Sequence, residues 1–299
     1  MAELAILYDA SRCSGCKGCQ SACKCWNLLP SPMGLNANPL TNSYQSPLDL
    51  DGDTRIHMRF NETPAEKNMV EWGFERRSCM HCTNAGCVKV CPSGALSKDP
   101  ETGMTKVQDD LCIGCQYCKT ACPFDVPRHF GVGPTINKCT ACLDRVAQDR
   151  APACVKTCPP AALDFGPRDE MLAIAHERVA WLKGRGYDRA EVYGETELGG
   201  LHVISVQKYG VAATQMPINP QINNVAGILD IMKPLAAIGT AAIVGGLGIS
   251  FLTGLGYKRD TLHYDEVTHD VIDLDTGEVV RHVDEFDEPV TALDEERKG

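Results

Sequence analysis

Aromatic residues are scarce in this chain of 299 residues: Phe, Trp and Tyr make up 6%, and apolar residues overall make up 43%. So small an aromatic fraction argues against one large close-packed core. Enzyme motifs are also missing, because the sequence has no Walker loop, no G-x-G-x-x-G fingerprint and no Ser-His-Asp arrangement. The chain is therefore expected to carry out no catalysis of its own. Five scattered histidines are expected to be structural: His57, His81, His129, His176 and His202.

Net charge is almost absent from most of the chain. The formal total is −10, but residues 257–299 hold 14 acidic and 5 basic side chains and so contribute −9 of it. No general affinity for nucleic acid is expected from the near-neutral remainder. The start, MAELAILYDASRC, has neither a basic segment nor an apolar stretch long enough for a signal peptide, so no export signal is expected.

Cysteine, by contrast, is abundant, and sixteen of the 17 cysteines fall into four groups. Disulfide frameworks belong mainly to short secreted chains with an even number of cysteines, so a disulfide scaffold is not expected. The groups are Cys13, Cys16, Cys19 and Cys23; Cys79, Cys82, Cys87 and Cys91; Cys112, Cys115, Cys118 and Cys122; and Cys139, Cys142, Cys154 and Cys158. A proline follows the last cysteine of every group except the first, where Lys24 takes that place.

The first and third groups have the spacing C-x2-C-x2-C-x3-C, which is typical of bacterial ferredoxins. Three of these thiolates can surround one [4Fe–4S] cluster, and the fourth ligates its neighbour. Gly15, Gly18 and Gly114 lie in the loops, where a missing Cβ lets the backbone approach a cluster. Sixteen thiolates thus predict four [4Fe–4S] clusters. Zinc, the alternative, does not explain the third cysteine or the following proline.

The pairing of the groups stays open on spacing alone. The second and third groups resemble one complete two-cluster ferredoxin over residues 76–133, and the first and fourth would then fold around this insert. Pairing the first group with the second, and the third with the fourth, is also possible because only sixteen residues separate Cys122 from Cys139. Cys25 is expected to be a bystander, since Cys23 already has the ligand spacing.

Other segments carry weaker signals. Residues 54–60 and 70–75 have the composition of a pair of strands, and residues 201–206 predict another strand. Apolar residues at helical spacing predict a helix over residues 168–183, which Gly184 and Gly186 could end in a left-handed conformation. Residues 30–50 are typical of a long loop. In the tail, VIDLDTGEVVRH predicts a hairpin turning at Asp275–Gly277, with a solvated mobile tail as the equal alternative.

Residues 234–257 contain no charged side chain, and their apolar part covers residues 235–255. A helix of this length reaches about 31 Å, the thickness of the hydrocarbon layer of a bilayer. One transmembrane helix is therefore expected, with a buried helix as the alternative. Lys233 precedes the segment and Lys258 and Arg259 follow it, which slightly favours a cytoplasmic C-terminus.

Small residues recur every four positions along this expected helix, at Ala242, Gly246, Ser250 and Gly254. Such spacing places them along one ridge. In lipid, helices associate through close backbone approach at small residues. The ridge therefore predicts a contact with a helix of a membrane partner, with the general abundance of Gly and Ala in membrane helices as the alternative.

The cysteine-containing stretches CMHCTNAGC, CIGCQYCKTACPFDVPR, KCTACLDRV and PACVKTCPPAALDFG resemble the four-cluster electron-transfer subunits that accompany molybdopterin oxidoreductases. Within that superfamily, HERVAWLKGRGYDRAEVY, GGLHVISV and MKPLAAIGTAA are similar to the iron–sulfur (β) subunit of membrane-bound formate dehydrogenases. The similarity runs from Leu4 to the membrane helix and is weakest in residues 24–75 and in the acidic tail. Family members have a longer extension before the first cysteine group, which is nearly absent here.

The resemblance implies that the first group pairs with the fourth and the second with the third. It implies four ligand sets: Cys13, Cys16, Cys19 and Cys158; Cys139, Cys142, Cys154 and Cys23; Cys79, Cys82, Cys87 and Cys122; and Cys112, Cys115, Cys118 and Cys91. The expected fold is α+β, with two interleaved bacterial-ferredoxin-like two-cluster domains and one C-terminal transmembrane helix. The expected divisions are residues 1–75 with 134–225 as the outer domain, 76–133 as the insert, 234–257 as the membrane helix and 258–299 as the acidic tail.

The resemblance also implies partners. Electrons would pass from a molybdenum or tungsten formate-oxidising subunit, which carries molybdopterin, through the clusters to a membrane cytochrome b and quinone. Export would require co-transport with a partner that bears a twin-arginine signal. The expected location is the inner membrane, crossed once, with the cluster domain periplasmic and the tail cytoplasmic.

Three alternatives belong to other classes. The chain could be the equivalent subunit of a membrane hydrogenase or of another molybdopterin reductase, and DPETG before the third group would suit a hydrogenase relative. A free soluble polyferredoxin is the second alternative, against which the expected membrane span argues. A structural module held by zinc is the third, and iron content would separate it at once.

Overall fold

The structure, a computed structural model, describes residues 3–30, 44–64, 69–129, 135–254 and 262–283. Most of the expected 30–50 loop, residues 31–43, lies outside this range, as do the last residues of the expected membrane helix and parts of the tail. The chain divides into two units, residues 1–234 and 235–299. Both hold helix and strand, so the fold is mixed α and β as expected.

A four-stranded sheet forms the centre of the first unit, in the order β8-β1-β10-β9. The strands are β1 (Leu4–Asp9), β8 (Leu163–Pro167), β9 (Glu191–Tyr193) and β10 (Val203–Gln207). β1 pairs parallel with β10 and antiparallel with β8. Because side chains alternate across a strand, Ala5 and Leu7 face one side of the sheet, and Ile6 and Tyr8 face the other.

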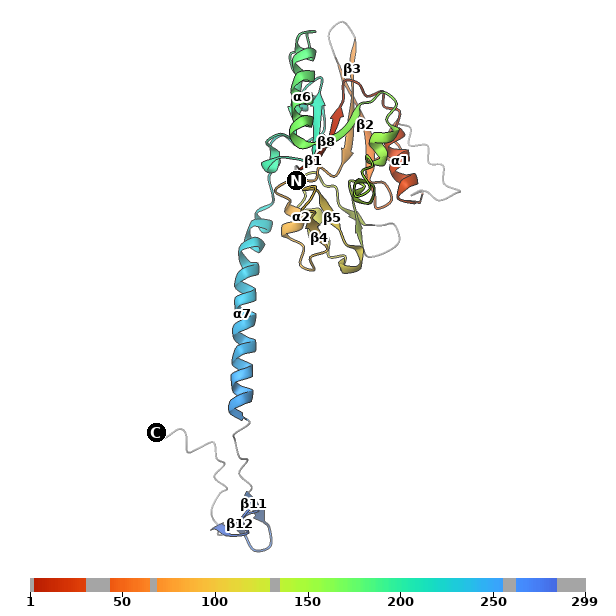
Figure 1. The fold of residues 1–299 in the computed structure, drawn as a ribbon. Helices are drawn as coiled ribbons and strands as arrows, with labels where there is room; N and C mark the ends of the chain where they lie inside the picture. Colours follow the sequence, from red (N-terminus) through yellow and green to blue (C-terminus); the bar gives the residue numbers. More distant parts are fainter. Residues whose placement is uncertain (1–2, 31–43, 65–68, 130–134, 255–261, 284–299) are drawn as a thin grey trace. The chain divides into compact units, whose positions relative to one another are not determined.

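Helix α6 (Arg168–Lys183) covers the first of these sides (Figure 1). Its buried residues Met171, Ala175 and Leu182 pack against Ala5 and Leu7. The helix has the bounds that the sequence predicts. The prediction for its end is right for Gly186, which has φ +89°, and wrong for Gly184, which keeps a helical φ of −62°. Glycine is therefore needed only at the second position.

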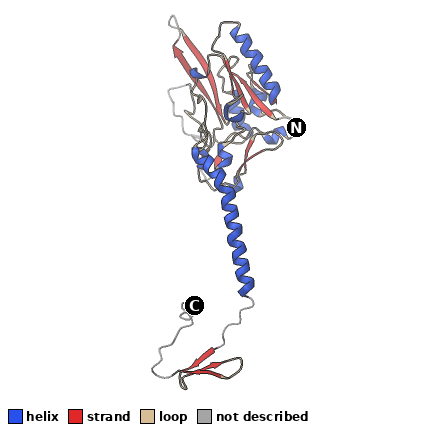
Figure 2. Cartoon of the chain, turned by 90° about the vertical axis from the view of Figure 1, so that its left-hand side faces the viewer, coloured by secondary structure: helices blue, strands red, loops and turns tan. Residues whose placement is uncertain are grey.

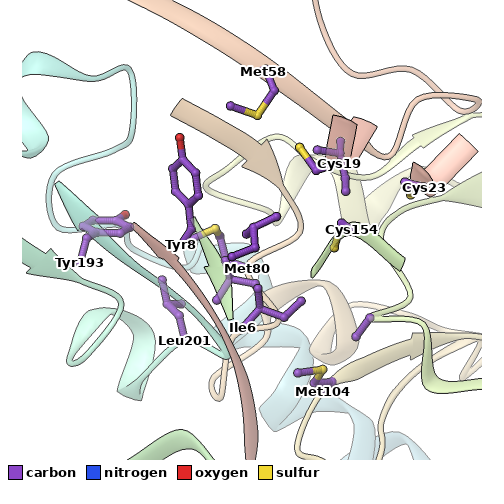
Figure 3. Packing of buried hydrophobic residues seen from close by; sticks show 14 of the residues in the cluster. Ile6, Tyr8, Cys19, Cys23, Met58, Met80, Met104, Cys154, Tyr193 and Leu201 are labelled. Atoms are coloured by element: carbon purple, nitrogen blue, oxygen red, sulfur yellow. The ribbon is translucent and has the colours of Figure 1, made fainter. Parts of the chain in front are cut away.

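The other side of the sheet faces the cysteine-bearing part of the chain. Ile6 and Tyr8 pack there in one cluster with Met58, Cys19 and Cys154, and Figure 3 shows these side chains together. The sheet thus has one face packed on a helix, and the other against thiols. The cysteines take the place of aromatic residues in this core, which accounts for the low aromatic fraction of the sequence.

The expected pair of strands is present as β2 (Ile56–Pro64) and β3 (Val70–Ser78), and both are longer than predicted. They pair antiparallel from Ile56–Ser78 to Pro64–Val70, and Figure 2 shows the long ribbon. Two shorter antiparallel pairs follow: β4 (Leu96–Lys98) with β5 (Thr105–Val107), and β6 (Arg128–His129) with β7 (Ile136–Asn137).

Five short helices carry or adjoin cysteines of the four groups. They are α1 (Gly18–Trp26), α2 (Gly86–Lys89), α3 (Tyr117–Thr120), α4 (Leu143–Val146) and α5 (Ala153–Thr157). Helix α1 packs against α5, and α2 packs against α3. The first group of cysteines therefore lies beside the fourth, and the second beside the third.

Helix α7 (Asn224–Gly254) covers most of the segment expected to span a membrane. Among the described residues, however, no helix meets the combined length and hydropathy of a bilayer span. The structure thus confirms a helix here but not its membrane location. The side chains described along it, those of residues 238–253, are all exposed.

In the second unit, the described part of the tail forms a three-stranded sheet of β11 (Leu262–Asp265), β12 (Asp270–Asp273) and β13 (Val279–His282). β12 and β13 pair antiparallel, which confirms the predicted hairpin. Gly277 lies in its turn with φ +72°, a conformation that favours glycine. Strand β11 is not anticipated by the sequence.

Candidate iron–sulfur site

The thiols of the first and fourth groups come together in two sets. Burial raises the pKa of Cys13, and the nearby charges of Cys158 and Cys16 raise it further. Burial also raises the pKa of Cys23, with further contributions from Cys139, Cys154 and Cys142. Cys158 thus lies near thiols of the first group and Cys23 near thiols of the fourth, while the ligand sets themselves stay a prediction.

The second and third groups exchange their last cysteines in the same way. The pKa of Cys82 is raised by burial and then by the charges of Cys79, Cys122 and Cys87. The pKa of Cys118 is raised to about 12 by burial and then by Cys115, with smaller effects from Cys91 and Cys112.

The four arrangements are called below the first set (Cys13, Cys16, Cys19 and Cys158), the second set (Cys23, Cys139, Cys142 and Cys154), the third set (Cys79, Cys82, Cys87 and Cys122) and the fourth set (Cys91, Cys112, Cys115 and Cys118).

One backbone feature recurs in all four groups. The residue immediately before the second cysteine has a positive φ: Gly15 (+66°), His81 (+48°), Gly114 (+70°) and Ala141 (+55°). The prediction that Gly15 and Gly114 serve this turn is confirmed. Gly18 is different, because it has no positive φ and a Cβ there would meet Cys16 Sγ at an ordinary 3.5 Å. His81 and Ala141 hold the same turn at a conformational cost that glycine avoids.

Amide groups point at several of the sulfurs. The backbone N–H of Gly15 donates to Cys13 Sγ at 3.4 Å, and that of Ala141 donates to Cys139 Sγ at 3.4 Å. The N–H of Ala162 donates to Cys158 Sγ at 3.3 Å. Hydrogen bonds to cysteine sulfur stabilise thiolate and help to set the reduction potential of an iron–sulfur cluster.

Cationic side chains are buried among these thiols. Arg76 is 4% exposed, and its Nη2 lies 3.7 Å from Cys154 Sγ. Lys138 is 2% exposed, and its Nζ donates to the carbonyl oxygens of Thr105 at 2.7 Å and Cys139 at 3.0 Å. Neither residue takes part in an ion pair with a carboxylate that the described residues show. No sequence motif points to either of these cations.

His81 lies beside Cys139. Its Nδ1 accepts the backbone N–H of Thr105 at 3.1 Å, which leaves the ring proton on Nε2. Nε2 is buried and has no partner in the described part of the chain. Burial acts to raise the pKa of Cys139, but His81 and the charge of Arg76 outweigh it and lower this pKa to about 6. Cys139 thus favours thiolate, whereas burial raises the pKa of Cys142 to about 11 and also raises that of Cys154.

The residues fit [4Fe–4S] clusters on these observations: neighbouring thiols, amide donors aimed at sulfur, and buried cations and an orphaned N–H that anionic clusters would satisfy. Among the described residues, no three His, Cys, Asp or Glu side chains stand at the spacing of a single metal ion. Cys25 is exposed, whereas Cys23 is buried in the second set.

The histidines have structural positions. His57 and His202 are fully buried, and His202 Nδ1 donates to the Leu4 carbonyl oxygen at 2.9 Å. His176 is half exposed and lies 3.1 Å from Glu195. Of these histidines, His81 is the one that lies beside a thiol. Its positive φ could not be predicted from the sequence.

These features define a class of protein in which cysteines hold paired iron–sulfur clusters. The 4Fe-4S dicluster domain matches residues 70–168. Over 273 residues the chain is 38% identical to the iron–sulfur subunit of the nitrate-inducible formate dehydrogenase of Escherichia coli, which covers 90% of this chain and 91% of that protein. It is 40% identical over 252 residues to the formate dehydrogenase iron–sulfur subunit of Haemophilus influenzae, and this match covers 83% of this chain and 78% of that protein. A hydrogenase-2 operon protein of Escherichia coli is 33% identical over 230 residues, and this match covers 68% of this chain and 69% of that protein.

The chain belongs to the family of formate dehydrogenase iron–sulfur subunits. It is accordingly an electron-transfer subunit and not a catalytic one, as the absence of enzyme motifs predicts.

Proposed function

We propose that this chain relays electrons through four [4Fe–4S] clusters, one held by each set of thiols, from a formate-oxidising molybdenum or tungsten subunit to a membrane cytochrome b and quinone. Each cluster supplies a centre that takes up and gives up one electron. The chain itself holds the clusters in thiolate, excludes water from them, and places amide and cationic groups around them. All sixteen ligands come from the four cysteine groups, and Cys25 is not one of them.

The observation that carries the proposal is a linear order of the sets. Cysteines of different sets interact electrostatically at three places: Cys19 with Cys154, Cys139 with Cys79, and Cys87 with Cys118. These interactions connect the first set to the second, the second to the third, and the third to the fourth. An electron can therefore pass along the sets in sequence.

The first and the last set in this order are the ones with a solvent-exposed cysteine. Among the sixteen proposed ligands, only Cys16 and Cys115 are exposed. Cys16 belongs to the first set and Cys115 to the fourth. Apolar side chains accompany the second of these, because Ile113 is 66% and Tyr117 is 56% exposed. The first set would receive electrons from the catalytic subunit, and the fourth would pass them on.

The proposed domains follow the same contacts. Residues 1–75 and 134–225 would form the outer two-cluster domain, supported by the packing of α1 on α5. Residues 76–133 would form the inserted one, supported by the packing of α2 on α3 and by the β4–β5 hairpin inside it.

Cutting the relay in the middle tests the proposal. Cys122→Ser removes a ligand of the third set, and Cys25→Ser is the matched control. After rapid mixing of the anaerobic complex with formate, electron paramagnetic resonance should show the first and second clusters reduced and the fourth oxidised in Cys122→Ser. All clusters should be reduced in Cys25→Ser. Reduction of the fourth cluster ahead of the first would contradict the proposed direction.

A hydrogenase subunit is the second candidate, favoured by the likeness to a hydrogenase-2 operon protein. The electron donor separates the two. Formate should reduce the clusters of the purified complex under argon, whereas hydrogen alone should not. The reverse result would assign the chain to a hydrogenase.

For the membrane we propose that α7 crosses the bilayer once, with the clusters on the periplasmic side, the tail in the cytoplasm, and export by co-transport with the catalytic partner. The support is the exposure of apolar side chains on every side of the helix, such as Ile243, Ile249 and Phe251. Water would solvate such a surface poorly. The small residues Ala242, Gly246, Ser250 and Gly254 would face the cytochrome b, and a Cβ at Gly246 would meet nothing within 4 Å among the described residues.

Two experiments test this arrangement. Replacing Gly246 and Ser250 together by Leu should leave the chain in the membrane fraction, but separate it from its haem-containing partner; undiminished co-purification would mean that another surface makes the contact. Protease added to spheroplasts should digest the cluster domain and spare the tail. Removal of the tail alone would reverse the orientation.

A further inference from the structure

Arg76 stands out among the charged residues of strand β3. Both of its neighbours are neutralised by ion pairs, since Glu75 pairs with Arg59 at 3.2 Å and Arg77 pairs with Asp49 and Asp125. Arg76 is 4% exposed and takes part in none of the ion pairs of the described residues. Its Nη1 donates to Ser78 Oγ, its Nη2 lies 3.7 Å from Cys154 Sγ, and its Nε has no partner in that part of the chain.

A buried guanidinium without an anion is costly. Removing an isolated charge from water costs several kcal/mol or more, and Arg stays protonated, so it cannot relieve this cost by losing its proton. The anionic groups nearest to Arg76 must therefore come from the thiols. Those that interact with it are Cys154, Cys139, Cys19 and Cys23.

These four cysteines do not belong to one set. Cys19 is in the first set, and Cys23, Cys139 and Cys154 are in the second. Cys19 and Cys154 are also the two cysteines through which these sets interact with each other. Arg76 thus lies where the first and second sets meet.

We propose that Arg76 is the shared counter-ion of the first and second clusters, and that its charge raises the reduction potential of both. The proposal rests on the four ligand sets of the proposed function. A [4Fe–4S] cluster with four thiolates is an anion, and reduction adds one more negative charge, so a nearby cation favours the reduced state.

The shared position has a consequence for the transfer step. If an electron passed between these clusters, the first would be oxidised by one electron and the second reduced by one. The electron would stay within the field of Arg76 before and after this step. The cation would therefore hold the electron on the pair without opposing its movement from one cluster to the other.

The test is a redox titration of the purified complex monitored by electron paramagnetic resonance. In Arg76→Met, the reduction equilibria of the first and second clusters should shift at least tenfold toward the oxidised state, about 59 mV for each one-electron couple. The third and fourth clusters should shift less. Arg76→Lys keeps the charge and should restore most of the shift. Arg77→Met removes the same charge one residue away, where carboxylates already balance it, and should shift the first two clusters less than twofold.

The outcomes separate this proposal from the proposed function. Wild-type protein with four titrating clusters, together with unshifted first and second clusters in an iron-replete Arg76→Met variant, would overturn the role of Arg76 alone. If Arg76→Met and Arg76→Gln both lose the iron of the first two clusters while Arg76→Lys keeps it, the requirement for a shared cation is upheld. If Arg76→Lys loses that iron as well, shape and not charge is what matters, and the proposal fails.

Discussion

Gly15 lies directly against the ring of Phe74, so that a Cβ at Gly15 would stand 2.7 Å from Cε1 of that ring. Phe60, which packs edge-on against Phe74 with the ring centroids 5.3 Å apart, would be 3.0 Å from the same Cβ. The loop between Cys13 and Cys16 is thus pressed onto the β2–β3 ribbon. The glycine is needed for its φ of +66° and also for this close approach.

We expect Gly15→Ala to weaken the first cluster specifically. The substitution adds the left-handed backbone cost of about 1 to 2 kcal/mol and a collision with the Phe74 ring. Gly94→Ala is the matched control, because Gly94 has a similar φ of +71° but no atom of the described part of the chain within 4 Å of its Cβ position. Iron content and the rate at which visible absorption fades in urea should show faster loss in Gly15→Ala. Equal loss of iron in both variants would show that the contact with Phe74 does not affect the stability of the first cluster.

The exchange of last cysteines predicts which cluster each ligand variant loses. Cys158→Ser should remove or convert the cluster held by Cys13, Cys16 and Cys19, and leave the third and fourth clusters intact. Spectroscopy of the reduced protein, by electron paramagnetic resonance and Mössbauer measurements, would identify the missing signal. Loss of the cluster bound by Cys112, Cys115 and Cys118 would instead show that the third group pairs with the fourth.

Cys25→Ser should change little. The Cys25 side chain is exposed, while Cys23 is buried near Cys139, Cys142 and Cys154. The variant should keep the iron content of the wild type, and should accept electrons at the same rate. A variant that lacks one cluster's iron would identify Cys25, in place of Cys23, as the ligand.

We expect the folded protein to lose stability in mild acid because of His202. The burial of His202 lowers its pKa to about 4, below the value of about 6.5 expected in the unfolded chain. As the pH falls below about 6.5, the unfolded chain binds a proton that the folded chain does not, so the stability contributed by the neutral ring is complete above that pH and is lost toward pH 4. The urea midpoint should therefore fall more steeply between pH 7 and 5 in the wild type than in His202→Asn.

Asn at this position can keep a donor for the Leu4 carbonyl oxygen while removing the titrating ring. His176→Asn, at a half-exposed position, is the control and should keep the slope of the wild type. Identical slopes in wild type and His202→Asn would mean that other groups govern the acid sensitivity.

Local signals in the sequence predicted the elements whose stabilising contacts are local. The helix over residues 168–183 and the β2–β3 pair follow from their own periodicity and composition. Strand β1 was missed, because its parallel partner β10 lies about 200 residues away and no turn connects them. Cysteine spacing alone left two pairings of the groups open, since what joins Cys23 to Cys154 is the packing of α1 on α5.

Arg76 shows why the surroundings of the clusters could not be predicted. It stands in the run Glu75–Arg76–Arg77, which is typical of an exposed, ion-paired strand. Both neighbours are ion-paired, but Glu75 is 2% exposed and so is buried as well. Only the fold shows that Arg76 is also buried, takes part in no ion pair of the described residues and lies among thiols. A run of three charged residues shortly before a cysteine group was the available signal.

The measurement that tests the central claim most directly is the iron and acid-labile sulfide content of the anaerobically purified chain. Four clusters predict about 16 iron and about 16 sulfide per chain, with no stoichiometric zinc. About eight of each, or zinc in place of iron, would contradict the four-cluster relay.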